Sequence, residues 1–183
     1  MTEYPKVTPS EKWKATLFDH QLTAINLLED REENHERFIE DNIKFYSNVG
    51  VFSDPTGYGK TLSVIGLIDR DKMKWDLTIP YTLEDRNSFY QSSNSLFQLT
   101  QTYKYKKIKT TLVLVNQSIL KQWVNEIKLM KIKNYFIIDK KKLAKETDIS
   151  QYNVVLVIPT MYNILVNRYT DITFKRFIYD EPV

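Results

Sequence analysis

A stretch of twenty residues, 49–68, constrains the fold of this chain more than any other. It reads VGVFSDPTGYGKTLSVIGLI: a short β-prone run, a loop with two glycines, and an apolar pattern typical of a helix. Gly57 and Gly59 are two of only four glycines in the chain. Glycine lets backbone N–H groups approach a phosphate closely. The stretch therefore predicts a strand, a phosphate-binding loop and a helix in succession.

The residues after these glycines match the chemistry that such a loop needs. Lys60 is placed to reach the β- and γ-phosphates of a nucleotide, and Thr61 to hold Mg²⁺ where the helix begins. The strict motif is G-x-x-x-x-G-K-[ST], and Asp54 stands here where its first glycine belongs. A glycine-rich turn before an ordinary helix is the alternative interpretation.

A second motif lies at residues 174–181, FKRFIYDE, which predict a strand that ends in Asp180 and Glu181. A carboxylate pair after a strand suits nucleotide hydrolysis. One acid holds Mg²⁺, usually through water, and the next orients or deprotonates the attacking water. Such a pair is weak evidence alone. Together with the loop at 57–61, it favours a nucleotide site.

Between the two motifs the sequence alternates between strand-like and helix-like runs. The predicted strands are 49–53, 110–115, 134–139, 152–160 and 174–181. The predicted helices are 17–30, 31–46, 61–71, 117–130 and 161–169, with a short charged helix or loop at 140–146. This alternation predicts an α/β domain with a mainly parallel sheet.

Residues 69–109 interrupt the alternation. They are rich in Ser, Asn, Gln and Tyr, and no apolar period persists through them, so they predict an insertion or a long surface loop. Within them, YKYKK (103–107) interleaves aromatic rings with lysines and could stack on a single nucleic-acid strand. A plain loop is the simpler interpretation.

Composition excludes several classes of protein. The chain has no cysteine, which rules out disulfides and thiolate zinc sites. No apolar run approaches the ~18 residues of a membrane helix, and residues 1–10 lack the apolar core of a signal peptide. We expect a soluble intracellular protein with no membrane partner. Its wealth of Lys, Asn, Ile and Tyr suits an AT-rich genome such as that of a large DNA virus, which would place it in the host cytoplasm, the nucleus or the virion.

Five segments together resemble the first RecA-like domain of superfamily 2 helicases and translocases, most closely the Swi/Snf-type and large-DNA-virus members. DPTGYGKT resembles their motif I, which commonly opens with Asp, and LFDHQLTAINLL resembles the preceding segment, with Gln21 at its glutamine. TLVLVNQSILKQWVNEI resembles motif Ia, and YNVVLVIPTMYNIL the segment that follows it. RFIYDEPV resembles motif II. The resemblance covers about residues 17–183 apart from 69–109.

The resemblance implies a RecA-like fold with ATP and Mg²⁺ as ligands. It implies a helical segment at 1–48, whose glutamine contacts adenine, and an ATP-binding core at 49–183. The residues implied to bind ATP are Gln21, Pro55, Thr56, Gly57, Tyr58, Gly59, Lys60 and Thr61. The implied catalytic residues are Lys60, Asp180 and Glu181, and those for Mg²⁺ are Thr61 and Asp180. Those implied to touch the phosphates of DNA or RNA are Gln117, Ser118 and Thr160.

The chain also departs from the family pattern. Pro182 and Val183 replace the usual Ala-His or Ala-Asp of motif II, and the sequence ends there, before the second RecA-like domain that supplies an arginine finger. We therefore expect a fragment truncated after motif II that binds ATP weakly and hydrolyses it slowly or not at all. A non-catalytic P-loop scaffold and a P-loop ATPase of another family remain as alternatives.

Several candidate contacts have plainer interpretations. Ser118 is a good helix N-cap, and Trp123 is better placed as a core residue than as a platform for bases. The basic run 139–145, DKKKLAK, adds phosphate affinity if it faces nucleic acid, but charge runs are usually solvated faces.

Overall fold

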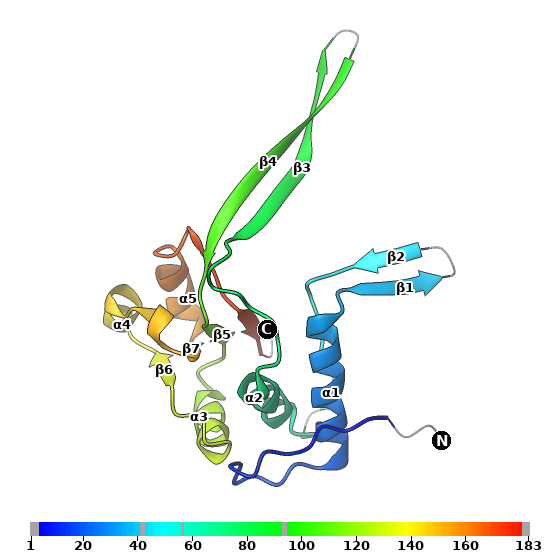
Figure 1. Ribbon diagram of the computed structural model, residues 1–183. Coiled ribbons are helices and arrows are strands. Elements are labelled where there is room, and N and C mark those ends of the chain that lie inside the picture. The colour runs from blue at the N-terminus through cyan, green and yellow to red at the C-terminus, as the bar shows by residue number, and fades with distance from the viewer. Residues whose placement is uncertain (1–3, 41–42, 56, 93–94, 181–183) are drawn as a thin grey trace. The chain divides into compact units, whose positions relative to one another are not determined.

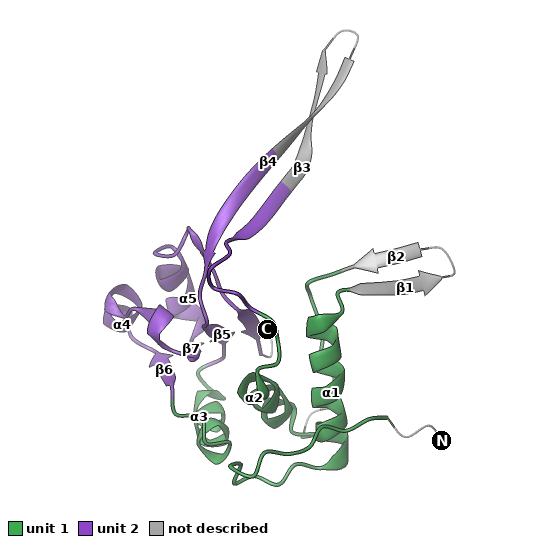
Figure 2. Cartoon of the chain, viewed as in Figure 1, with its two compact units in different colours: residues 1–74, 117–133 green, residues 75–116, 134–183 purple. Residues whose placement is uncertain are grey.

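The computed structural model describes residues 4–40, 43–55, 57–92 and 95–180 (Figure 1). The chain divides into two compact units (Figure 2). Unit 1 comprises Met1–Lys74 and Gln117–Lys133, and unit 2 comprises Trp75–Asn116 and Asn134–Val183. Each unit is described by itself.

Unit 1 is built on three helices that the sequence predicted. These are α1 (Asp19–Glu33), α2 (Lys60–Arg70) and α3 (Leu120–Leu129). Helix α2 contacts both of the others. The apolar residues buried in unit 1 include Trp13, Leu22, Ile25, Ile65, Ile68, Trp123, Ile127 and Met130. Trp123 is 1% exposed, so the prediction that it is a core residue is confirmed.

Three contacts join α1 to α2 along one face of α1. The side chain of Gln21 donates to the carbonyl oxygen of Gly59 just before α2. One turn further on, Ile25 packs so close to Gly66 that a Cβ there would lie 2.6 Å from the Ile25 Cδ1 atom. One turn later Glu29 meets Arg70. Residues four apart lie on the same face of a helix, so a single face of α1 makes all three contacts.

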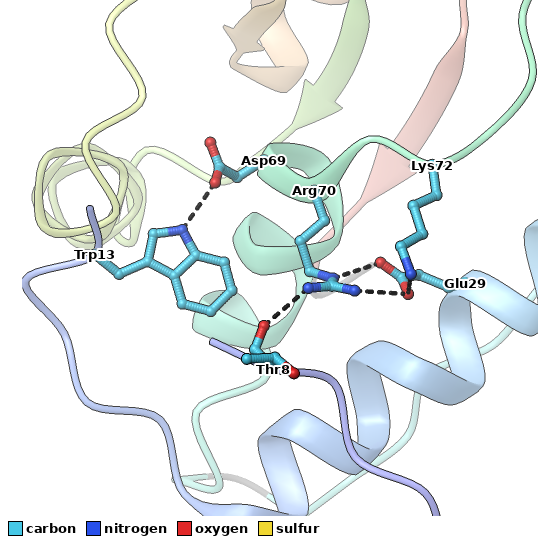
Figure 3. Close-up of polar contacts among 6 residues, drawn as sticks. All are labelled: Thr8, Trp13, Glu29, Asp69, Arg70 and Lys72. Atoms are coloured by element: carbon cyan, nitrogen blue, oxygen red, sulfur yellow. Dashed lines mark hydrogen bonds and ion pairs between the residues drawn. The ribbon is translucent and has the colours of Figure 1, made fainter. Parts of the chain in front are cut away.

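The end of α2 is fixed by polar groups (Figure 3). Arg70 Nε donates to Glu29 Oε1 at 2.6 Å, and Arg70 Nη1 donates to the Thr8 carbonyl oxygen at 2.9 Å. Trp13 Nε1 donates to Asp69 Oδ2 at 2.8 Å. These bonds attach the N-terminal segment and α1 to the last turn of α2.

The helix predicted for residues 31–46 is wrong. Helix α1 ends at Glu33, and strands β1 (Glu36–Glu40) and β2 (Ile43–Tyr46) pair as an antiparallel hairpin. The sequence itself carries a signal for this hairpin. Aromatic and β-branched residues flank Asp41 and Asn42, which are turn-favouring residues between two strand-like runs.

The strand predicted for residues 49–53 is also wrong. These residues form no strand in the structure, and the side chains of Val49 and Val51 are 71% and 88% exposed. Their backbone is held locally instead, because Arg31 and the Ser47 hydroxyl both donate to the Val49 carbonyl oxygen. A run of five residues with only three apolar side chains is too short for periodicity alone to identify a strand.

Unit 2 contains a four-stranded parallel sheet in the order β6-β7-β5-β9. The strands are β5 (Thr111–Leu114), β6 (Tyr135–Ile138), β7 (Val154–Val157) and β9 (Arg176–Tyr179), as the sequence predicted. Helices α4 (Lys141–Glu146) and α5 (Pro159–Val166) share an apolar core with the sheet, and a 3-10 turn, η1, spans Ile149–Gln151. The predicted α/β class with a parallel sheet is therefore confirmed.

A long antiparallel hairpin replaces the surface loop predicted within 69–109. Strands β3 (Tyr81–Ser92) and β4 (Ser95–Lys107) pair along their length, with one irregularity between Asp85 and Ser88. At its base β4 pairs in parallel with β8 (Ile172–Thr173). A two-stranded ribbon has no single buried face, so it leaves no clear apolar period in the sequence.

Helices that could cross a membrane are absent from the described part of the chain, since none is both long and apolar enough.

We predict that Glu29→Ala destabilises unit 1. Glu29 has a side chain 6% exposed that pairs with Arg70, so its loss leaves the guanidinium without its carboxylate. The expected cost is about 2–3 kcal/mol in free energy of unfolding, measured by urea denaturation with tryptophan fluorescence. Glu33→Ala, at an exposed position of the same helix, is the matched control. Equal effects of the two variants would contradict the role given to the Glu29 pair.

Candidate nucleotide site and nucleic-acid contacts

The backbone of the loop before α2 is shaped by two glycines with positive φ. Gly57 has φ 87°, and Gly59 has φ 72° and is the N-cap of α2. No side chain of the described residues caps this helix. The first bond from its start is Ser63 N–H to the Gly59 carbonyl oxygen at 3.2 Å. The N–H groups ahead of it have no partner within a helix, and a helix start of this kind attracts anions.

Two side chains of α1 hold consecutive carbonyl groups of the loop. Gln21 Nε2 donates to the Gly59 carbonyl oxygen at 3.1 Å, and His20 Nε2 bonds the Tyr58 carbonyl oxygen at 3.1 Å. A carbonyl oxygen only accepts, so this bond requires the proton on His20 Nε2. In a planar trans peptide the N–H points opposite to the C=O. Fixing these two carbonyls therefore fixes the directions of the Gly59 and Lys60 N–H groups.

Gln21 is a buried part of this arrangement, with only 3% of the residue exposed. Its Oε1 atom accepts from the Phe18 N–H at 2.8 Å, so both ends of its amide are engaged at the start of α1 and at the loop. Its predicted contact with adenine is not tested by the structure. The structure adds a contact with the loop that the sequence did not predict.

The lysine of the motif lies over the loop's own backbone. Lys60 Nζ donates to the carbonyl oxygens of Asp54 at 2.7 Å and Pro55 at 3.2 Å. Thr61 follows it in the first turn of α2 and is half-buried. The structure therefore brings Gln21, Pro55, Gly57, Tyr58, Gly59, Lys60 and Thr61 together. The predicted Thr56 lies outside the described residues.

Three rings line the outside of the loop, and sequence reasoning missed two of them. Phe18 and His20 stack with ring centroids 5.8 Å apart, and Tyr58 meets His20 edge-on at 5.4 Å. Phe18 and Tyr58 are 70% and 53% exposed. The available signal was the histidine directly before Gln21, since neighbouring residues in a first helical turn can both reach one loop.

The second predicted motif lies in unit 2, at the carboxyl edge of the parallel sheet. Asp180 directly follows β9, and its N–H donates to the Leu114 carbonyl oxygen at 3.1 Å. Thr160 follows β7 in the first turn of α5 and is exposed. Parallel strands end at one edge of their sheet, so these two predicted residues share that edge. Glu181 lies outside the described residues.

The remaining predicted nucleic-acid contacts are exposed. Gln117 and Ser118 follow β5, and the N-cap of α3 is Ile119, so the interpretation of Ser118 as a helix cap is wrong. Lys141, Lys142 and Lys145 are exposed on α4, and Lys140 is exposed at its N-cap.

No cluster of three or more His, Cys, Asp and Glu capable of holding a metal ion occurs in the described parts of the chain. A Mg²⁺ ion that accompanies a nucleotide needs no such cluster. It takes one or two protein oxygens and completes its shell with phosphates and water. A hydroxyl at Thr61 and a carboxylate at Asp180 are the donor types that suit this ion.

Comparison with known proteins identifies the family. A model of the SNF2-related domain matches residues 20–181. The chain belongs to this family. The DNA repair protein RAD5 of Candida glabrata is 29% identical over 136 residues, which cover 70% of this chain and 12% of that protein. The chain thus spans a small part of the length of this relative.

Membership in the SNF2-related family confirms the coarser part of the predicted resemblance. The family consists of helicase-like, ATP-hydrolysing domains that act on DNA. Both the loop and Asp180 fall inside the matched residues.

We predict that Gly59→Ala is the most damaging of three glycine substitutions. A Cβ at Gly59 meets Gln21 Nε2 and is forced to a positive φ, whereas one at Gly57 faces open space and one at Gly50 lies 3.8 Å from Arg31 Cγ. We expect the free energy of unfolding to fall by roughly 2–4 kcal/mol for Gly59→Ala, by roughly 1–2 kcal/mol for Gly57→Ala and by under about 1 kcal/mol for Gly50→Ala. Urea denaturation measures all three.

A double-mutant cycle isolates the collision from the backbone strain. In a Gln21→Ala background, Gly59→Ala should cost less than it does alone, because the colliding amide is gone. Strictly additive costs would show that Gln21 does not occupy the space beside Gly59.

Proposed function

We propose that this chain is the ATP-binding lobe of a nucleic-acid-dependent ATPase, a helicase or translocase that couples ATP hydrolysis to movement on nucleic acid. One observation carries the proposal. The loop before α2 has two peptide groups fixed by His20 and Gln21, directly at a helix start that no described side chain caps. These bonds orient the Gly59 and Lys60 N–H groups at a position where a helix start attracts anions.

In this proposal the loop binds the phosphates. The N–H groups at 57–61 and the start of α2 receive the phosphate oxygens. Lys60 exchanges its bonds with the Asp54 and Pro55 carbonyl oxygens for bonds with the β- and γ-phosphates. The exchange keeps the ammonium group hydrogen-bonded in both states, so phosphate binding leaves no buried charge without a partner.

Thr61 and Asp180 are the residues proposed to hold Mg²⁺, which when bound neutralises phosphate charge. Glu181 is proposed to orient the attacking water, and Gln117, Ser118 and Thr160 to contact the phosphates of the nucleic acid. DNA is the favoured substrate because the SNF2-related family acts on it. Full activity is proposed to need an arginine from a second RecA-like domain in the same or a partner chain.

We predict that Lys60→Ala weakens binding of a fluorescent ATP analogue in the presence of Mg²⁺ by about 10-fold to 100-fold, the effect of losing a charged hydrogen bond. Lys74→Ala, at an exposed lysine beyond the end of α2, is the matched control. Titration followed by fluorescence anisotropy measures both. Identical affinities for wild type and Lys60→Ala would overturn the phosphate-loop assignment and favour a non-catalytic scaffold.

ATPase assays with and without single-stranded DNA, duplex DNA and RNA choose the substrate. Asp180→Asn should suppress whatever hydrolysis wild type shows and leave nucleotide binding largely intact, because the change keeps the size of the side chain and removes its charge. Hydrolysis by Asp180→Asn at the wild-type rate would remove Asp180 from the proposed site.

A further inference from the structure

The base of the β3–β4 hairpin carries an aromatic face. The pairing sets Tyr81 opposite Tyr105 and Leu83 opposite Tyr103. Side chains alternate between the two faces of a strand, and directly paired residues share a face. These four side chains therefore form one face at the root of the hairpin seen in Figure 1. Thr82, Lys104 and other polar residues occupy the opposite face.

This aromatic face is accessible and stands on a fixed frame. Leu83 and Tyr103 are 44% and 38% exposed. Beneath them, Lys106 N–H donates to the Asp171 carbonyl oxygen at 2.8 Å where β4 pairs with β8, and Trp75 Nε1 donates to the Ile108 carbonyl oxygen at 2.8 Å. A third strand at the base gives a two-stranded ribbon support that it lacks alone.

Lysines lie at one end of this face and on the opposite side of the ribbon. Lys107 Nζ lies 4.8 Å from the centroid of the Trp75 ring, at the lower end of the aromatic face. Lys104 and Lys106 are exposed on the opposite face of the same strand. Within 81–84 and 101–109, where side chains are described, there are four lysines and a single acidic residue, Glu84.

We propose that the face formed by Tyr81, Leu83, Tyr103 and Tyr105 binds single-stranded nucleic acid, with bases on the tyrosine rings and phosphates near the lysines. Aromatic rings interleaved with positive charge bind single strands with little sequence preference, because every base has a π-face. The proposal extends the proposed function to a second contact surface. It stands on residues of unit 2 alone and needs no ATP.

Spacing favours a single strand over a duplex. Alternate residues of a strand lie about 6.6–6.8 Å apart, so Tyr103 and Tyr105 are separated by roughly twice the ~3.4 Å step between stacked nucleotides. Two rings at this spacing can each stack on a base when neighbouring bases are not stacked on one another. A duplex keeps its bases stacked and offers no free base faces to the tyrosines.

The lysines argue against a protein partner for the same face. The cores of protein interfaces are enriched in tyrosine but depleted of lysine. Here Lys107 continues the aromatic face, and Lys104 and Lys106 lie on the opposite face of the same strand, β4. Polyanion binding uses both features of the surface, whereas a protein interface uses only the rings.

The test uses the whole chain without nucleotide and a fluorescein-labelled thymine oligonucleotide, with binding followed by anisotropy. Tyr103→Ala should weaken affinity by about 5-fold to 150-fold, the range for one lost base–aromatic stack, and Tyr103→Phe should restore it. Thr102→Ala, one residue away on the opposite face, is the matched control. Circular dichroism checks that each variant is folded.

A bromodeoxyuridine oligonucleotide supplies a readout that needs no variant, since photo-crosslinks should map to Tyr103 or Tyr105. Unchanged affinity of Tyr103→Ala, or crosslinks that avoid both tyrosines, overturns the proposal. Self-association of wild type that Tyr103→Ala abolishes, with oligonucleotide affinity unchanged, overturns it in favour of a protein interface. If the oligonucleotide binds in a way that depends on Tyr103 but ATP does not bind, the proposed function is wrong and this inference is still supported.

Discussion

The directions of two peptide groups, Tyr58–Gly59 and Gly59–Lys60, set which hydrogen-bond donors the loop before α2 presents. Their carbonyl oxygens are held by His20 and Gln21, so their N–H groups are fixed in the opposite direction. Two side chains from one helical turn thus orient the loop in the absence of any ligand. Preorganisation of this kind reduces the ordering cost that binding has to overcome.

Gly59 is required by the same arrangement for two separate reasons. Its φ of 72° is a conformation that residues with a Cβ rarely adopt, and the space where a Cβ would stand is filled by Gln21. At Gly57 only the first reason applies, since nothing lies within 4 Å of the position of its Cβ. The two glycines of one motif are therefore needed on different grounds.

The sequence predicted the helices that bury one apolar face and the strands of the parallel sheet. Strands β5 and β7 are fully buried and appear as continuous apolar runs, and the glycines at 57 and 59 mark the loop. Local sequence patterns could not predict the hydrogen bonds that orient the loop, because Gln21 and Gly59 are 38 positions apart in the chain. Only folding brings such a pair together.

The wrong predictions concern segments that lack one buried face. At its base the β3–β4 hairpin has rings on one face and polar groups on the other, and both faces reach solvent there. Serine, threonine and glutamine in such a ribbon look like loop residues in the sequence. The run at 49–53 shows the opposite error. Its valines have the sequence pattern of a buried strand, but they are exposed and form no strand.

Helix α1 couples the stability of unit 1 to the shape of the loop. Gln21, Ile25 and Glu29 are spaced four apart on one face, and they meet Gly59, Gly66 and Arg70 in the same order along α2. A shift of α1 along α2 that breaks the Glu29 pair therefore also moves Gln21 relative to the loop. Buried polar residues at both ends of this face make the packing specific, since an apolar face alone tolerates sliding. The packing of α1 on α2 in unit 1 therefore also sets the directions of the N–H groups at the start of α2.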